Sequence, residues 1–522
     1  APLQVDAAPI YIQEKVHPKA IIDDIRRRQK GAEDWKYESD APDLFADFNG
    51  IPDVEDKLRY YEHDSVGLKW SNRLILGDSL AVMASLAEKE GLRGKVQMIY
   101  LDPPYGIKFN SNWQVSTRDR DVKDGKQEGM SREPEVVRAF RDTWAMGTHT
   151  YLSYLRDRLI AARELLAETG SVFIQIGDEN VASVCAIADE VFGADNRLCI
   201  ISFSKSSGTN SPSGRTLVLS STTDYLVWFA KDSQRVKYRQ LMLDKADGSS
   251  FEAVYREGDD GKGPFTLSDL TAQKPTTVFD FTCRGNSYNP LPRGWRTTEA
   301  GMRRLEKTER IVQVKNSVRL RQYLRDYPIN PINNLWEDTG TGSFTDEKVY
   351  VVQTGTKVVQ RCLLMTTDPG DLVIDPTCGS GTTAYVAEQW GRRWITIDTS
   401  RVALTLARTR LMSARYPHYL KKDSPEGAGK EAELTGRPAS DGPFTHNIAH
   451  GFVYKRVPHV TLKSIANNAE IDVIWDKHQP GVEKARAELN AAVQLYVDTL
   501  PKKDRPAWST WEEWQVPRPS VF

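Results

Sequence analysis

Residues 372–383 read LVIDPTCGSGTT, and this stretch decides the fold. A short apolar run with strand character leads into Asp375, and a glycine-rich turn follows at 379–381. Thr382 then opens a helix that Gly391 ends. Glycines at a strand-to-helix turn let a ligand approach the backbone, and the helix N-terminus offers unpaired N–H groups. The stretch therefore predicts a site for a nucleotide-type cofactor in an α/β fold.

This loop differs from the two common nucleotide-binding loops. A P-loop requires Gly-Lys-Ser/Thr, and no lysine stands here, while Gly379 and Gly381 have no third glycine to complete a dinucleotide pattern. Asp398 ends the next apolar run, nineteen residues after Gly379. A carboxylate at that spacing commonly holds ribose hydroxyls. The plain alternative is a tight turn followed by an aspartate that caps a helix.

A second motif, Asp102-Pro103-Pro104-Tyr105, directly follows the apolar run VQMIYL at 96–101. The two prolines fix φ and stop the strand, which holds the aspartate and the tyrosine at its carboxyl end. A carboxylate and a prolyl carbonyl can accept the two N–H bonds of a planar amine, and the ring can stack on its face. Taken alone, such a tetrapeptide is more often an ordinary turn.

Other short apolar runs repeat this rhythm along the chain. They lie at 74–76, 172–176 and 395–397, and between the runs lie amphipathic helices such as 151–168, with Gly170 as its stop. Apolar runs that do not alternate with polar residues suit strands buried on both faces of a parallel sheet. The rhythm predicts α/β architecture, and a further helix is expected near residues 481–496.

Composition narrows the class of protein. With 522 residues the chain is long enough for about three domains. Hydrophobic residues make up 39%, and no run approaches the roughly 18 apolar residues of a membrane span. The five cysteines form no CxxC pair and the eight histidines no metal-binding spacing, so we expect a cytoplasmic protein without a metal. The chain lacks an initiator Met, which leaves open that it is a fragment.

Together, the two motifs resemble those of the DNA amino-methyltransferases, which transfer a methyl group from S-adenosylmethionine to an exocyclic base nitrogen. DPPY comes first and the cofactor loop some 270 residues later, the order of the β-class. LGDS at 76–79 and GSVFIQIGD at 170–178 also match segments of this family. Residues 295–311 and 333–340 look like modification subunits of type III restriction systems. The likeness covers roughly residues 74–411.

The resemblance implies a Rossmann-like S-adenosylmethionine-dependent methyltransferase sheet with an inserted target-recognition domain. It also implies transfer to adenine N6 in duplex DNA by base flipping, with S-adenosylmethionine as the cofactor. The carboxylate and prolyl carbonyl would hold the amine while the tyrosine stacks on the flipped base. The implied catalytic residues are Asp102, Pro103, Pro104 and Tyr105, and the implied cofactor-binding residues are Asp78, Asp375, Pro376, Cys378, Gly379, Gly381, Thr382 and Asp398.

One segment departs from the family pattern. Relatives usually carry a YPTQKP-like motif before the cofactor loop, whereas residues 349–361 read VYVVQTGTKVVQR, in which Gln353 and Lys357 are candidates for the same role. Three alternatives stay open. The first is methylation of cytosine at N4, although relatives with that activity more often have Ser in place of Asp102. The second is a methyltransferase that acts on RNA or protein. The third is an inactive scaffold that binds the cofactor.

Charge points to a local nucleic-acid surface. The net charge of −1 excludes binding by bulk basicity, but residues 281–330 hold eleven basic against four acidic side chains, a net of +7. Charge runs are usually solvated faces. In this motif order, however, the target-recognition region lies between the catalytic and cofactor halves, where this segment falls. The candidate DNA-binding residues are Arg293, Arg296, Arg303, Arg304, Arg319 and Arg321.

These features give an expected domain layout. Residues 1–70 form an N-terminal arm, 71–230 the catalytic half, 231–345 the target-recognition insert, 346–420 the cofactor-binding half, and 421–522 a linker and C-terminal segment. The expected partner is double-stranded DNA, and no association with a membrane is expected. A homodimer or a restriction subunit is left open as a further partner.

Overall fold

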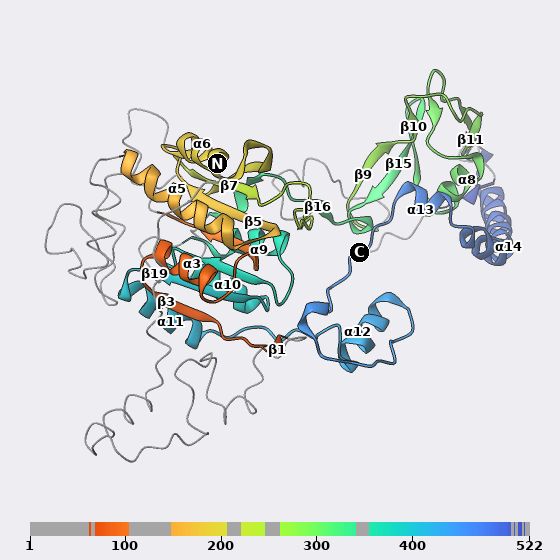
Figure 1. Cartoon of the computed structure of the whole chain (residues 1–522). Coiled ribbons are helices and arrows are strands. Elements are labelled where there is room, and N and C mark those ends of the chain that lie inside the picture. The colour runs from red at the N-terminus through yellow and green to blue at the C-terminus, as the bar shows by residue number, and fades with distance from the viewer. Residues whose placement is uncertain are drawn as a thin grey trace, which may run out of the picture. The chain divides into compact units, whose positions relative to one another are not determined.

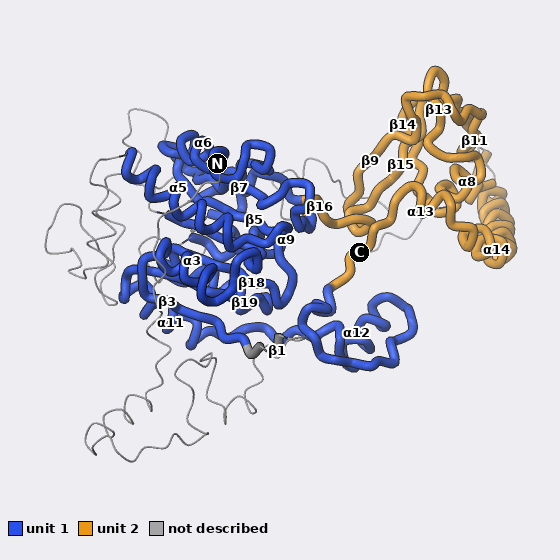
Figure 2. Tube along the Cα trace, in the orientation of Figure 1, with its two compact units in different colours: residues 1–241, 332–454 blue, residues 242–331, 455–522 orange. Residues whose placement is uncertain are grey.

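The computed structural model of the chain describes residues 62–63, 68–103, 148–205, 221–245, 262–340 and 354–502, together with 506, 510–513 and 516. The chain forms two compact units, shown in different colours in Figure 2. Unit 1 combines residues 1–241 with 332–454, and unit 2 combines 242–331 with 455–522. None of the helices in the described part of the chain has the length and apolarity needed to cross a membrane.

Unit 1 is built on an eight-stranded sheet (Figure 1). The strand order is β17-β6-β7-β5-β4-β18-β19-β3, and only β7 runs antiparallel to its neighbours. The α/β class predicted from sequence is therefore confirmed. The strands are β3 (Arg73–Leu76), β4 (Val96–Leu101), β5 (Leu166–Ile176), β6 (Arg197–Ser204), β7 (Thr223–Ala230), β17 (Leu335–Trp336), β18 (Leu372–Asp375) and β19 (Arg393–Asp398).

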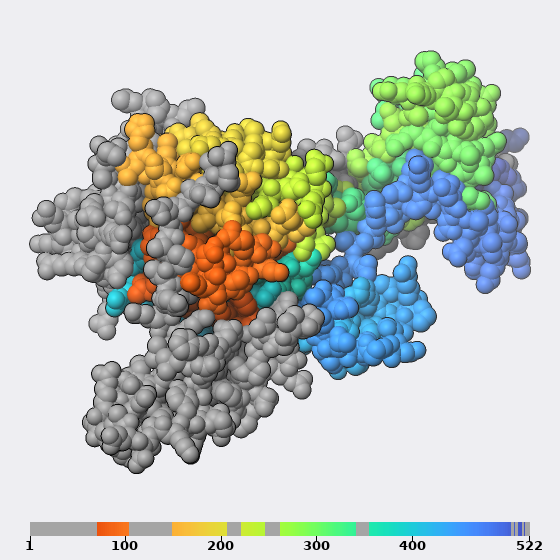
Figure 3. Space-filling model, viewed as in Figure 1, coloured from red at the N-terminus to blue at the C-terminus, as the bar shows by residue number. Residues whose placement is uncertain are grey.

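Helices pack on this sheet in two groups. The first group is α3 (Ser79–Glu88), α5 (Thr148–Leu165) and α6 (Val181–Phe192). In this group α5 contacts both α3 and α6, and α3 and α5 lie side by side on the face of unit 1 in Figure 3. The second group is α9 (Thr356–Thr366), α10 (Thr382–Gln389) and α11 (Arg401–Ser413). All six residues of β4 are buried, as expected for a strand covered on both faces.

Successive side chains of the central strands point to opposite faces of the sheet. Ile99 and Leu101 join the core that α3, α5 and α6 cover, together with Leu155 and Met83. Tyr100 stands between them and points the other way, and its hydroxyl donates to Oε1 of Gln175 on β5 at 2.6 Å. This alternation follows from the two-residue period of a strand.

The predicted helix at 151–168 is wrong at its end. The helix α5 stops at Leu165, and Gly170 lies inside β5 rather than after a helix. A Cβ atom at Gly170 would lie 3.0 Å from the carbonyl oxygen of Val96, where the pairing of β4 with β5 shifts register. Gly170 therefore permits a close approach of two strands.

A helix also occupies part of the predicted linker in unit 1. The helix α12 spans Pro425–Thr435, and the Ser424 side chain accepts a hydrogen bond from the Gly427 N–H at 3.0 Å. Gly436, in the left-handed region, follows its last residue. Ser at the N-cap, Pro in the first turn and Gly at the end are ordinary helix boundaries, so a loop-like composition here encodes a capped helix. A two-stranded ribbon, β1 (Glu62–His63) and β2 (Leu68–Lys69), completes unit 1.

Unit 2 packs short strands against three helices from two stretches of chain. Its core joins Leu305 and Met302 of α8 to Leu462 and Ala466 of α13. The last helix, α14, is longer than predicted and runs through Pro480. The helices are α8 (Glu299–Lys307), α13 (Leu462–Ala466) and α14 (Glu470–Thr499), and the strands are β8 (Met242–Asp244), β9 (Phe265–Asp269), β10 (Thr271–Ala272), β11 (Phe281–Cys283), β12 (Asn286–Tyr288), β13 (Gly294–Trp295), β14 (Ile311–Val314), β15 (Ser317–Tyr323) and β16 (Ile329–Pro331).

Candidate active site

Four aspartates stand at the carboxyl ends of four adjacent parallel strands, and we call them the aspartate row. In sheet order they are Asp102 after β4, Asp375 ending β18, Asp398 ending β19, and Asp78 two residues after β3. From β4 the chain runs by α5 to β5 on one side, and from β18 it runs by α10 to β19 on the other. A parallel sheet binds ligands at such a switch in direction. The row therefore brings together all four carboxylates that the sequence nominated.

Asp102 is fixed at its backbone and at its side chain. Its N–H donates to Oγ1 of Thr377 at 2.9 Å, and Thr377 Oγ1 lies 3.2 Å from Oδ1 of Asp375. The Asp102 Oδ2 atom accepts from the Thr354 hydroxyl at 3.0 Å. Thr377 is part of the glycine-rich loop, so the DPPY motif and that loop are hydrogen-bonded to each other.

The cofactor loop closes on Asp398. Gly379 donates its N–H to Asp398 Oδ2 at 2.9 Å, and Ser400 donates its N–H to Oδ1 at 2.8 Å. A backbone hydrogen bond from Thr399 also reaches this carboxylate. The two oxygens of a carboxylate offer about four acceptor sites, so capacity remains for a ribose diol. Gly381 has φ +72°, and a Cβ atom there would lie 2.7 Å from Cβ of Ala407 on α11. Glycine at 381 therefore permits both the left-handed turn and the close packing of α11.

The remaining nominated residues of the loop are buried. Pro376, Cys378 and Thr382 are buried, and Cys378 donates its N–H to the Ile397 carbonyl at 2.9 Å. Burial raises the pKa of the Cys378 thiol well above its ordinary value, which fits a small packed side chain. Lys357 lies 3.2 Å from a carboxylate oxygen of Asp338 and is half exposed. Pro104, Tyr105 and Gln353 lie outside the described residues.

Sequence reasoning missed an aromatic and an arginine beside Asp78. Arg158 forms an ion pair with Asp78, and its Nε donates to the Ser79 hydroxyl at 2.8 Å. The Arg158 guanidinium lies over the Tyr154 ring, 3.4 Å from its centroid. Both residues lie on α5, one turn apart. In the sequence alone they belong to the polar face of that helix. Their i, i+4 spacing was the available signal.

Burial disfavours the charged form of three carboxylates of the aspartate row, those of Asp102, Asp375 and Asp398. It raises the pKa of Asp102 to about 7, and the nearby Asp375 and Asp224 carboxylates add to this rise, whereas the hydrogen bond from Thr354 opposes it. Burial likewise raises the pKa of Asp375 and of Asp398 to about 6. A set of raised carboxyl pKa values at a sheet edge is typical of a functional site. Within the described residues, no group of three or more His, Cys, Asp or Glu side chains is arranged to hold a metal ion.

In unit 2, three nominated arginines surround Asp269 at the end of β9. Arg293 and Arg319 lie 3.6 Å and 3.8 Å from its carboxylate oxygens, and Arg296 donates to its carbonyl oxygen at 3.1 Å. We call Arg293, Arg296 and Arg319 the arginine cluster. The Arg293 and Arg319 side chains are 53% and 40% exposed, so a polyanion can reach them.

The other three nominated arginines are held by protein groups. Arg304 donates to Asp472 and to the Ala466 carbonyl, both at 2.8 Å, and its side chain is only 19% exposed. Arg303 donates to the Thr282 carbonyl at 2.8 Å, and Arg321 lies 4.9 Å from the centroid of the Phe265 ring. Arg304 therefore ties α8 to α13 and α14.

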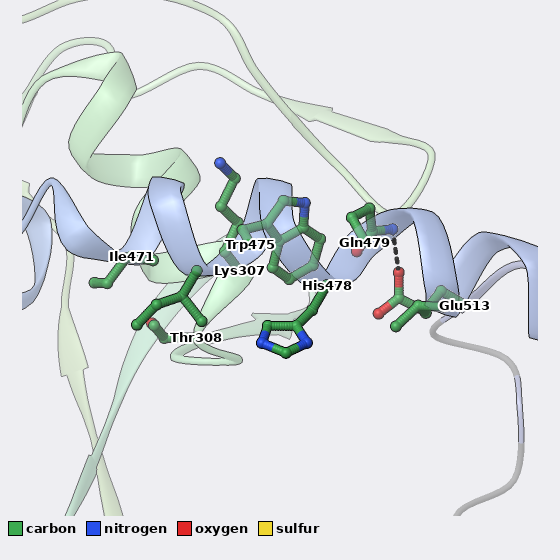
Figure 4. A pocket seen from close by; sticks show the side chains of 9 residues that line it. Lys307, Thr308, Ile471, Trp475, His478, Gln479 and Glu513 are labelled. Atoms are coloured by element: carbon green, nitrogen blue, oxygen red, sulfur yellow. Dashed lines mark hydrogen bonds between the residues drawn. The ribbon is translucent and has the colours of Figure 1, made fainter.

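Unit 2 also contains a pocket, between α8 and α14 (Figure 4). Trp475, Ile471 and His478 line it from α14, and Lys307 and Thr308 line it from the end of α8. Gln479 and Glu513 meet at one side through a hydrogen bond of 3.3 Å. Its mostly apolar lining differs from the aspartate row, so we do not assign the cofactor to it.

Comparison with known proteins agrees with this geometry. The family model described as DNA methylase, of the N6/N4 type, matches residues 96–409, which is more than half of the chain. The chain belongs to this DNA methylase family. The matched range includes Asp102, Asp375 and Asp398 of the aspartate row and contains the whole segment from DPPY to the cofactor loop.

Two curated relatives and one solved structure show the extent of the similarity. The type II methyltransferase M.EcaI of Enterobacter cloacae is 27% identical over 331 residues, covering 62% of this chain and 66% of the relative. A probable type III restriction-modification Mod subunit, HindVI of Haemophilus influenzae, is 24% identical and covers 66% of this chain and 51% of the relative. The solved M1.HpyAVI–SAM complex has 14% identity and a TM-score of 0.32, covering 65% of this chain and 98% of that one. The chain spans about half to two thirds of the length of these two curated relatives.

Proposed function

We propose that this chain transfers the methyl group of S-adenosylmethionine to N6 of adenine in duplex DNA. The aspartate row is the observation that carries the proposal, because it joins the DPPY carboxylate to a glycine loop and a ribose-type acceptor. When bound, S-adenosylmethionine supplies an electrophilic methyl group on a sulfonium. The membership in the DNA methylase family supports the same reaction class.

Asp102 would act on the target amine. An exocyclic amine is a poor nucleophile, because its lone pair is delocalised into the ring. The carboxylate of Asp102 and the carbonyl of Pro103 can accept its two N–H bonds and stabilise positive charge that develops on nitrogen. Asp102 must be ionised for this role. Because its pKa is about 7, we expect the transfer rate to rise with pH through this range.

The loop residues fit the cofactor. The left-handed glycines Gly379 and Gly381 keep side chains out of the turn, and Asp398 retains acceptor capacity for ribose hydroxyls. Asp78 is 46% exposed beside the Tyr154 ring, which suits the adenine end of the same cofactor. This assignment gives each carboxylate of the row a ligand-facing role except Asp375, whose contact with Thr377 supports the loop.

Unit 2 would recognise the DNA. It contains the arginine cluster, and its chain segment 242–331 falls between the catalytic and cofactor halves of the fold. Exposed guanidinium groups pair readily with phosphates. The relatives named Mod subunits belong to restriction-modification enzymes, so we also propose a protein partner, either a second copy or a restriction subunit. Five free cysteines suit a cytoplasmic setting.

Transfer of tritiated methyl groups tests the proposal directly. The chain is incubated with labelled S-adenosylmethionine and duplex DNA, and the labelled nucleoside is then identified. We expect N6-methyladenine, and we expect Asp102→Ala to lose the label while it still binds the cofactor. N4-methylcytosine would change the target base, and label in RNA or protein would reject DNA as the substrate. If no substrate is methylated, the proposed activity is rejected and the alternative of a cofactor-binding scaffold is favoured.

A further inference from the structure

A chain of hydrogen bonds runs from the sheet interior to Asp102. The Tyr100 hydroxyl donates to Oε1 of Gln175 at 2.6 Å, and Nε2 of Gln175 donates to Oγ1 of Thr354 at 2.9 Å. The Thr354 hydroxyl donates to Oδ2 of Asp102 at 3.0 Å. Tyr100 lies on β4, Gln175 lies on β5, and Thr354 directly precedes the N-cap of α9, so three elements contribute.

The direction of this chain is fixed by burial. Tyr100 and Gln175 are 1% and 4% exposed, and a buried amide is costly unless its oxygen and nitrogen both find partners. The Gln175 oxygen takes the Tyr100 proton, which turns the Gln175 nitrogen toward Thr354. Thr354 Oγ1 then accepts from Gln175. The Thr354 hydroxyl also lies 3.2 Å from Oε1 of Gln175, but that oxygen already accepts from Tyr100, so the shorter bond of 3.0 Å to the Asp102 carboxylate takes the proton.

Thr354 also reaches the cofactor loop. Its carbonyl oxygen lies 3.5 Å from the hydroxyl of Thr382, the first residue of α10. Thr354 is 252 residues from Asp102 in sequence and follows the segment that leads back from unit 2. One residue thus contacts the catalytic carboxylate through its side chain and the cofactor helix through its backbone.

We propose that Thr354 is a positioning residue for methyl transfer, whose hydroxyl holds Oδ2 of Asp102 and leaves Oδ1 to accept from the target amine. This inference rests on the proposed function of Asp102. The hydrogen bond fixes the carboxylate rotamer and favours its ionised form. Among the residues that the structure describes, the other titratable groups that act on Asp102 are Asp375 of β18, Asp224 of β7 and Tyr151 of α5, and they are the same in every variant compared below.

Two substitutions separate the hydroxyl from the shape of the side chain. Thr354→Val removes the donor at nearly constant volume, and Thr354→Ser keeps the donor. We expect Thr354→Val to lower kcat by roughly 10- to 100-fold, the effect expected when a hydrogen bond to a charged group is lost. The KM values for DNA and cofactor should change little, and Thr354→Ser should stay close to the parent. The acid limb of the kcat–pH profile should move to higher pH in Thr354→Val, because the opposing effect on the Asp102 pKa is lost.

A titration without substrate distinguishes this inference from the proposed function. The carboxyl carbon of Asp102 is followed by ¹³C NMR in aspartate-labelled chain and assigned by its absence in Asp102→Asn. We expect Thr354→Val, but not Thr354→Ser, to titrate at higher pH than the parent. An unchanged titration and kcat in Thr354→Val, or equal defects in both variants, would overturn the positioning role. A parent chain that transfers no methyl group would instead reject the proposed function, while the titration still decides the role of Thr354.

Discussion

At the scale of single residues, the site combines carboxylates that the fold partly removes from water. Asp102 has a pKa of about 7 in the folded chain against an ordinary value of 3.8. The folded state therefore keeps this proton to higher pH than the unfolded state does. The contribution of the group to stability is fully present below pH ~4 and is lost as pH rises through about 7. Ionised Asp102 therefore lowers the free energy of unfolding at the same pH at which the proposed role requires an ionised acceptor.

Asp102→Asn should reveal this cost. The amide has nearly the same shape but carries no charge at any pH. The free energy of unfolding of the variant should therefore rise above that of the parent as the pH increases from about 4 to about 8. We expect a gain on the order of 2 kcal/mol, less than the full shift would give, because Asp102 is only partly buried. Urea unfolding at several pH values measures this difference. A difference that is constant over the whole range would contradict the raised pKa.

Asp398→Ala tests the cofactor assignment at the same scale. A ribose that loses a carboxylate partner loses roughly 1.5 to 3 kcal/mol, so the affinity for S-adenosylmethionine should fall by one to two orders of magnitude. Calorimetry measures it directly. Asp368→Ala is the control, because Asp368 pairs with Lys237 and Arg239 instead of standing in the aspartate row. An Asp398→Ala chain with parental affinity would remove Asp398 from the site.

At the scale of elements, the local sequence was enough to predict a helix or strand whose structure depends on its own residues. The apolar run at 96–101 is β4 to the residue, because burial on both faces leaves no alternation to misread. The long-range partners were not predictable in the same way. Thr354 reaches Asp102 across 252 residues, and Arg304 reaches Asp472 across 168. Neither pairing leaves a trace in local spacing, so a count of charges could not show that Arg304 pairs with Asp472.

Gly381 permits the turn on which the cofactor helix begins. In Gly381→Ala the left-handed φ of +72° and the 2.7 Å approach to Ala407 should together cost about 2 to 4 kcal/mol. The variant should also bind the cofactor more weakly. Gly429 lies inside α12, and a Cβ atom added there would have no other atom within 4 Å, so Gly429→Ala should instead stabilise by about 0.5 to 1 kcal/mol. Thermal unfolding compares the two, and equal effects would contradict the steric argument.

At the scale of the whole molecule, positive charge is concentrated without making the chain basic. The net charge is −1, yet three guanidinium groups of the arginine cluster share the single residue Asp269. Its one carboxylate can neutralise only one of them. A phosphate backbone would satisfy the excess, and each neutralised phosphate would release counterions. We therefore expect DNA affinity to depend on salt mainly through unit 2.

Replacing Arg293 and Arg319 with Ala should weaken DNA binding at low salt. It should also flatten the plot of log affinity against log salt by about two, one for each lost phosphate contact. Fluorescence anisotropy with a duplex between about 50 and 200 mM salt measures the slope. The control is Lys422→Ala with Lys430→Ala, which removes two side chains of 54% and 45% exposure from unit 1. If both double variants flattened the slope equally, bulk charge rather than the arginine cluster would hold the DNA. Cofactor affinity should stay unchanged in both, because neither pair touches the aspartate row.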